Sequence, residues 1–122
     1  YICITKPRRF GKTSIADMLG AYYSKAFNSR EVFDKLNISK DESYEKNINK
    51  YNVINISFNK IPENGSKYSD YISMIKNSLI KDIEKNFSSI NINDFYTISD
   101  ILQATNEKFI FILDEWDYIF NI

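Results

Sequence analysis

The stretch KPRRFGKTS, residues 6–14, concentrates positive charge near the start of the chain. Four cations fall within it: Lys6, Arg8, Arg9 and Lys12. Like charges this close repel one another unless something negative lies among them. A turn that only reverses the chain needs no such charge, so the pattern predicts a binding site for a small anion.

The chemistry that fits these residues is phosphate binding. Backbone amides around Gly11 would converge on a phosphate at the start of a helix, where the positive end of the helix dipole adds to the attraction, and Gly11 would leave room for the ligand. The Lys12 ammonium would extend to the β and γ phosphates of a nucleotide, and the Thr13 hydroxyl would coordinate Mg²⁺. The predicted nucleotide-binding residues are Arg9, Phe10, Gly11, Lys12, Thr13 and Ser14.

The loop departs from the general phosphate-loop motif G-x-x-x-x-G-K-[ST] at its first position. Glycine is expected at position 6, where this chain has Lys6, and Pro7 stiffens the segment that follows. A bare G-K-T also occurs often by chance, so the prediction depends on the surrounding elements.

Two carboxylates, Asp114 and Glu115, directly follow the apolar run FIFIL near the end of the sequence. This is the pattern of a Walker B element, in which Asp114 would hold Mg²⁺ through water and Glu115 would orient or deprotonate the attacking water. The simpler alternative is that both residues only begin a solvated loop. Their order after the basic loop favours the Walker B interpretation. The predicted catalytic residues are therefore Glu115 and Lys12, and the predicted metal ligands are Thr13 and Asp114.

Alternating strands and helices are predicted to position these side chains. The predicted elements are a strand at 1–5, a phosphate loop at 6–13, a helix at 13–27, a strand at 51–58, helices at 66–87 and 98–105, and a strand at 109–113. Residues 30–50 show no clear periodicity beyond one short helix. The order of elements predicts an α/β fold with a mostly parallel sheet, whose ligands bind beyond the carboxyl ends of the strands.

The apolar residues of these elements give further expectations about burial. Six apolar residues recur at helical steps, which places them on one side of the first helix: Ile15, Met18, Leu19, Tyr22, Tyr23 and Ala26. The strand at 109–113 has no polar face and should be covered on both sides. Cys3 lies within an apolar run and is expected to be a small buried residue. The pair Asn64-Gly65 predicts a turn after the strand at 51–58.

Composition excludes several classes of function. Sixteen basic and sixteen acidic residues cancel among 122, so the segment has no overall charge with which to hold a nucleic acid. With no histidine and a single cysteine, it has no Cys/His metal set, no His-based triad and no intrachain disulfide. No apolar run is long enough to span a bilayer, and a cytoplasmic location is the simplest expectation. Since the sequence opens without methionine directly in a predicted strand, we expect a piece of a longer protein.

Three segments, TKPRRFGKT, VINISF and FILDEWD, resemble the AAA-ATPase-like family, a branch of the P-loop NTPases with the additional catalytic glutamate. The resemblance covers essentially the whole chain, and in that family Pro-Arg-Arg-Phe-Gly-Lys-Thr commonly stands where the first glycine is absent. It implies a three-layer P-loop NTPase fold, of which this chain would be an incomplete N-terminal part. It also implies ATP and Mg²⁺ as cofactors, and in longer members a predicted PD-(D/E)XK nuclease-like domain.

ATP binding and Mg-dependent hydrolysis to ADP and phosphate are therefore the predicted function. Two alternatives stay open: a nucleotide-binding switch or scaffold with little turnover, and the ATP-driven module of a nucleic-acid-processing protein. A small-molecule kinase is a weaker option because no acceptor site is evident. Trp116 and Tyr118 could stack on a base, but packing is the commoner role for such aromatics, and Asp117 is expected to cap a helix.

Overall fold

The computed structural model describes residues 2–59, 68–89, 91 and 97–121. The chain divides into two compact units, the first formed by residues 1–56 and 109–114 and the second by residues 57–108 and 115–122. The turn predicted at Asn64-Gly65, the first residue of the predicted strand at 1–5 and the first two residues of the predicted helix at 66–87 lie outside the described residues.

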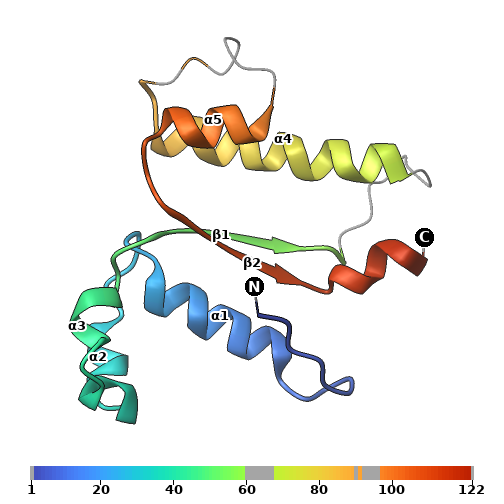
Figure 1. The fold of residues 1–122 in the computed structure, drawn as a ribbon. Helices are drawn as coiled ribbons and strands as arrows, with labels where there is room; N and C mark the ends of the chain where they lie inside the picture. Colours follow the sequence, from blue (N-terminus) through green and yellow to red (C-terminus); the bar gives the residue numbers. More distant parts are fainter. Residues whose placement is uncertain (1, 60–67, 90, 92–96, 122) are drawn as a thin grey trace. The chain divides into compact units, whose positions relative to one another are not determined.

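The first unit contains a parallel pair of strands with a helix packed against it. Its elements are α1 (Lys12–Tyr23), α2 (Arg30–Phe33), the 3₁₀ helix η1 (Asn37–Lys40), α3 (Tyr44–Asn47), β1 (Asn52–Ser57, the last residue of which belongs to the second unit) and β2 (Phe109–Asp114). Strands β1 and β2 are neighbours and run in the same direction (Figure 1). Helix α1 packs on β2, where the backbone at Gly20 comes close to the Ile112 side chain.

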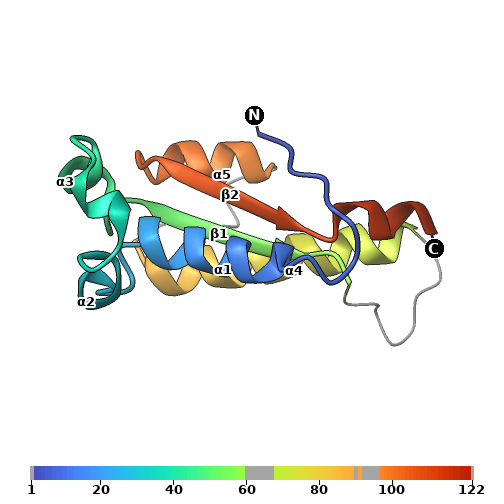
Figure 2. The same ribbon diagram turned by 90° about the horizontal axis from the view of Figure 1, so that it is seen from below.

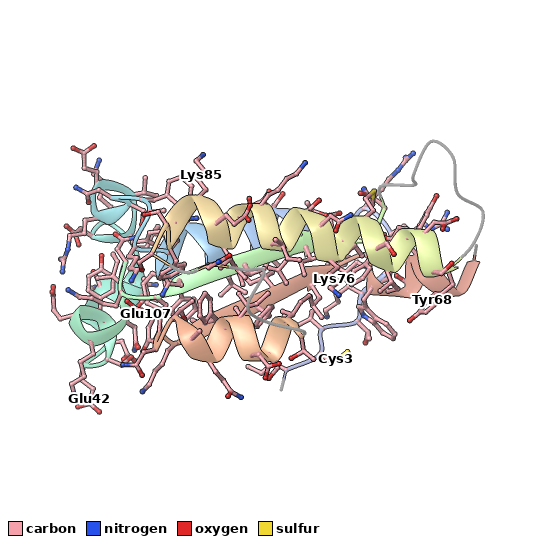
Figure 3. All side chains as sticks on the ribbon, turned by 90° about the horizontal axis from the view of Figure 1, so that it is seen from above. Cys3, Glu42, Tyr68, Lys76, Lys85 and Glu107 are labelled. Atoms are coloured by element: carbon pink, nitrogen blue, oxygen red, sulfur yellow. The ribbon has the colours of Figure 1, made fainter. Side chains whose placement is uncertain are left out.

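The strand predicted at 1–5 is wrong for its described part, because residues 2–7 have no regular secondary structure. Ile2 is 93% exposed and Ile4 is half exposed, so the apolar run is not buried. A strand needs a neighbouring backbone to pair with, and an apolar sequence alone does not supply one. The same segment leaves Cys3 exposed, contrary to the expected burial (Figure 3).

Helix α1 ends at Tyr23, four residues before the predicted end, because the chain changes partners there. Ser24 is extended, with ψ 126°, and forms a parallel bridge with Tyr51. The Tyr51 amide donates to the Tyr23 carbonyl at 2.9 Å, and the Tyr51 carbonyl accepts from the Lys25 amide at 2.9 Å. Pairing with the segment that enters β1 therefore replaces the last turn of the predicted helix.

Asn49 caps this end of α1 with its side chain. Its amide nitrogen donates to the carbonyls of Ala21 at 3.0 Å and Ser24 at 2.9 Å, and its backbone amide donates to the Tyr22 carbonyl at 2.7 Å. The last carbonyls of a helix have no partner within it, so these bonds satisfy groups that would otherwise be left open. Asn49 has φ 53°, a left-handed conformation that asparagine tolerates better than most residues.

Residues 30–50, which show little periodicity, fold into three short helical elements beside the end of α1 (Figures 1 and 2). Their core is aromatic: Tyr22 from α1 contacts Phe33 at 5.2 Å and Tyr44 at 6.0 Å between ring centroids. Ile48 is 1% exposed and completes the cluster. Short helices are not stable alone, so this packing is what holds them in place.

A polar network ties α2 to α3 at the edge of the aromatic cluster. The Arg30 guanidinium forms a paired contact with the Glu45 carboxylate, with one bond of 3.1 Å from Nη1 to Oε1, and this hydrogen bond lowers the pKa of Glu45. The Tyr44 hydroxyl donates to Asp34 at 2.6 Å. Burial, reinforced by this bond to a carboxylate, raises the pKa of Tyr44 to about 12.

Helix α1 and strand β2 both leave apolar side chains exposed, and for β2 this contradicts the expected burial on both sides. Ile15, Met18 and Leu19 on α1 are 46%, 51% and 39% exposed, and only Tyr22 of that helix is buried. On β2, Phe111 and Leu113 are also exposed, so the strand is covered on one face and not on both. Helical and strand periodicity predict which residues share a face, but they do not show what covers that face.

In its described residues, the second unit contains two helices and a closing 3₁₀ helix. Its elements are α4 (Tyr68–Asn86), α5 (Ile98–Ala104) and η3 (Trp116–Asn121). The Thr97 hydroxyl accepts a hydrogen bond from the Asp100 amide at 3.1 Å and so caps α5. Lys85 lies in the last turn of α4, where a cation favours the helix dipole (Figure 3). The buried apolar residues of the second unit are Tyr71, Leu79 and Ile83 on α4 and Ile101 on α5.

We predict that Asn49→Asp destabilises the protein by about 1–3 kcal/mol, because the new carboxylate oxygen cannot donate to the Ala21 and Ser24 carbonyls. Urea denaturation measures the change. Asn106→Asp is the matched control, since Asn106 is also left-handed, with φ 53°, but its side chain is exposed. The control should change stability by less than about 0.5 kcal/mol. Equal effects of the two substitutions would contradict the capping role.

Candidate functional site

The basic loop of residues 6–11 leads directly into the first turn of α1. The helix begins at Lys12, and its first bond runs from the Ile15 amide to the Gly11 carbonyl at 3.1 Å. The first amides of any α-helix have no acceptor within the helix, and they carry the positive end of its dipole. The loop therefore presents cationic side chains and helix-start amides in one short segment, which suits an anion.

Gly11 is required here by its backbone conformation. It precedes the helix with φ 80° and ψ 23°, in the left-handed region. A Cβ built on Gly11 would meet no atom within 4 Å, so the structure leaves open space at this position. The open space agrees with the expected room for a ligand, and the positive φ adds a second reason for glycine that the sequence alone did not reveal.

The Lys12 side chain folds back across the loop. Its ammonium donates to the Lys6 carbonyl at 3.0 Å and so joins the first residue of the loop to the first residue of α1. An ammonium has three N–H donors, and this bond uses one of them. The Lys12 charge is thus held beside the helix start.

Thr13 and Asp114 meet although they are 101 positions apart in the chain. The Thr13 hydroxyl donates to the Oδ2 atom of Asp114 at 2.7 Å. Thr13 belongs to the first turn of α1, and Asp114 is the last residue of β2. Figures 1 and 2 both show the start of α1 at the end where β2 finishes. The structure therefore brings together the two residues that the sequence predicts as metal ligands.

This pair suits a magnesium ion in its donor chemistry. When the Thr13 hydroxyl donates its hydrogen bond to Asp114, its two lone pairs point elsewhere and can bind a cation. Magnesium prefers oxygen ligands and keeps several waters, so it is commonly held by one or two protein groups together with phosphates. Among the described residues, no three His, Cys, Asp or Glu side chains gather as a larger metal site.

Glu115 follows Asp114 in the chain but belongs to the second unit, as the first residue of its segment 115–122. It is exposed and has φ 56°, an uncommon conformation for a residue with a side chain. Its carbonyl accepts a bond from the Tyr118 amide at 3.0 Å, which starts the turn into η3. Asp117 lies inside the first turn of η3, two residues past the capping position, so the expectation that it caps this helix is wrong.

The remaining predicted residues lie on the exposed side of the loop and helix. Arg9 has φ 62° and is exposed, and Ser14 is exposed in the first turn of α1. Phe10 is 61% exposed, and its ring lies under the Lys6 ammonium, 5.3 Å from nitrogen to ring centroid. The sequence analysis did not predict this contact. The signal that it offered was Lys6 itself, which stands where the general motif has glycine.

The comparisons with known proteins were made for the whole chain. A family model for the AAA-ATPase-like family, described as a predicted AAA-ATPase, matches residues 1–121. No curated protein and no solved structure gave a significant match. Separately, no helix in the described part of the chain has both the length and the apolar character needed to cross a membrane.

We predict that Gly11→Ala destabilises the protein by about 1–2 kcal/mol, because alanine is strained at a left-handed φ. Thermal or urea denaturation measures this cost. Gly20→Ala is the matched control: Gly20 lies within α1, and its added Cβ would meet the Ile112 side chain at an ordinary 3.8 Å. Alanine favours the helix there and should stabilise it by about 0.5–1 kcal/mol. A Gly11→Ala protein as stable as the wild type would contradict the conformational requirement.

Proposed function

We propose that this chain, which belongs to the AAA-ATPase-like family, binds ATP with Mg²⁺ at the start of α1 and hydrolyses it to ADP and phosphate. The observation that carries the proposal is the hydrogen bond between Thr13 and Asp114. It joins the helix that follows the basic loop to the carboxylate that ends β2, which is the pairing that a triphosphate with a metal ion requires. The parallel pair of strands is compatible with part of a three-layer P-loop domain.

Each residue at the start of α1 has a distinct role in this proposal. The amides of Phe10, Gly11, Lys12 and Thr13 bind phosphate oxygens, with Arg9 and Ser14 flanking them, and the Lys12 ammonium uses its remaining donors on the β and γ phosphates. Thr13 and Asp114 hold the magnesium ion, which neutralises charge on the phosphates. Phosphoryl transfer gains mainly from such positioning and charge compensation, so few residues are needed.

Glu115 is the proposed general base. It follows the metal-binding carboxylate directly and is exposed, so water can reach it. In the proposed step it accepts a proton from the water that attacks the γ phosphate. The family resemblance implies a nuclease-like domain in longer chains, but the proposal for this chain concerns ATP alone.

We predict that Lys12→Ala weakens Mg·ATP binding by roughly tenfold to a hundredfold, because charge-assisted hydrogen bonds to the phosphates are lost. Titration with a fluorescent ATP analogue measures the affinity. Glu115→Gln should keep the wild-type affinity but lose about a hundredfold or more in hydrolysis rate, since glutamine cannot take up the proton.

Lys35→Met is a suitable control, because Lys35 is an exposed lysine of the same unit that lies far along the chain from the loop. It should bind and hydrolyse ATP as the wild type does. If Lys12→Ala and Lys35→Met bound Mg·ATP equally well, the proposed site would be wrong. If Glu115→Gln hydrolysed ATP normally, the assignment of the base would be wrong.

A further inference from the structure

Lys6 makes two contacts within the loop, one through its backbone and one through its side chain. Its carbonyl accepts the bond from the Lys12 ammonium at 3.0 Å, and its own ammonium lies 5.3 Å from the centroid of the Phe10 ring. Any residue at position 6, glycine included, could offer the carbonyl. Only a long cationic side chain can reach the face of the ring.

The two ammonium groups thus have different acceptors although they belong to the same loop. The Lys12 ammonium donates a hydrogen bond to a carbonyl, and the Lys6 ammonium lies over the negative face of an aromatic ring. Separate acceptors relieve the repulsion between two cations that the loop brings close together. They also keep both side chains off the amides at the start of α1, which stay available to an anion.

Phe10 contributes its ring from a strained part of the loop. The residues on either side of it, Arg9 and Gly11, have φ 62° and 80°, both in the left-handed region. A side chain in this conformation costs free energy, so the loop needs contacts that hold it. Phe10 is 61% exposed and is not part of the buried core of the first unit, and its ring contacts the Lys6 ammonium.

We propose that the contact between the Lys6 ammonium and the Phe10 ring is a brace that sets the position of Lys12 for phosphate binding. Lys6 and Phe10 are then positioning residues: the brace fixes the backbone at position 6, and the Lys6 carbonyl fixes the Lys12 ammonium. The inference rests on the proposed function, since it concerns the same phosphate site. It explains how this loop does without the glycine of the general motif.

A double-mutant cycle on Mg·ATP affinity tests the brace. We expect Lys6→Met and Phe10→Leu each to weaken binding by about two- to fivefold, the range set by an exposed cation–π contact. Lys6→Met also removes a positive charge near the phosphates, so the single variant cannot separate the two effects. The combined variant can, because a brace predicts that Phe10→Leu adds little once Lys6 is methionine.

Conservative replacements give a second readout that a purely structural role would not produce. Lys6→Arg and Phe10→Tyr keep a cation and an aromatic face, and each should restore most of the lost affinity. Phe27→Leu is the matched control for the ring, because Phe27 is 63% exposed in the same unit. It should bind Mg·ATP as the wild type does.

The outcomes separate the brace from the proposed function. If Lys12→Ala loses affinity while Lys6→Met and Phe10→Leu have independent, additive effects or none, the ATP site stands and the brace is wrong. If Lys12→Ala binds Mg·ATP as tightly as the wild type, the ATP site itself is wrong, and the brace fails with it. The brace is established if Lys6→Met and Phe10→Leu cause coupled losses of Mg·ATP affinity and if Lys6→Arg and Phe10→Tyr keep most of that affinity.

Discussion

One hydrogen bond, from the Thr13 hydroxyl to the Asp114 carboxylate, is the contact on which the proposed function of the first unit depends. The bond is 2.7 Å long and joins two residues that are 101 positions apart in the sequence. It holds the start of α1 against the end of β2. A hydroxyl that donates to a carboxylate keeps its lone pairs for a cation, and the charge of the carboxylate attracts that cation. The start of α1, with its helix dipole, and the proposed metal site therefore lie at the same end of the sheet.

The loop before α1 supplies the complementary positive charge, and its own backbone limits how it can do so. Gly11 turns the chain into the helix through a left-handed backbone conformation, and Arg9, two residues earlier, also has a left-handed backbone. Two contacts inside the loop offset the free-energy cost of these left-handed conformations. The Lys12 ammonium donates to the Lys6 carbonyl, and the Lys6 ammonium lies over the Phe10 ring. The result is a cationic segment whose amides at the helix start are not used by its own side chains.

Local signals in the sequence predicted several of the helices and strands, whereas tertiary contacts decided the features that these signals could not predict. Helix α5 and strand β2, which extends one residue beyond the predicted 109–113, follow from short stretches of sequence. The end of α1 cannot be predicted in this way, because its last carbonyls accept hydrogen bonds from Asn49 and Tyr51, which lie far along the chain. The exposed residues 2–5 show the same limit, since strand formation depends on a partner that an apolar pattern cannot specify.

Binding of Mn²⁺ in place of Mg²⁺, followed by electron paramagnetic resonance in the presence of ATP, tests the Thr13–Asp114 pair most directly. Wild-type protein should hold Mn²⁺ in an ATP-dependent manner, and Asp114→Asn should weaken this binding by about ten- to a hundredfold. Asp17→Asn, which removes an exposed carboxylate one turn along α1 from Thr13, should leave it unchanged. Equal Mn²⁺ binding by Asp114→Asn and the wild type would contradict a metal site at the end of β2.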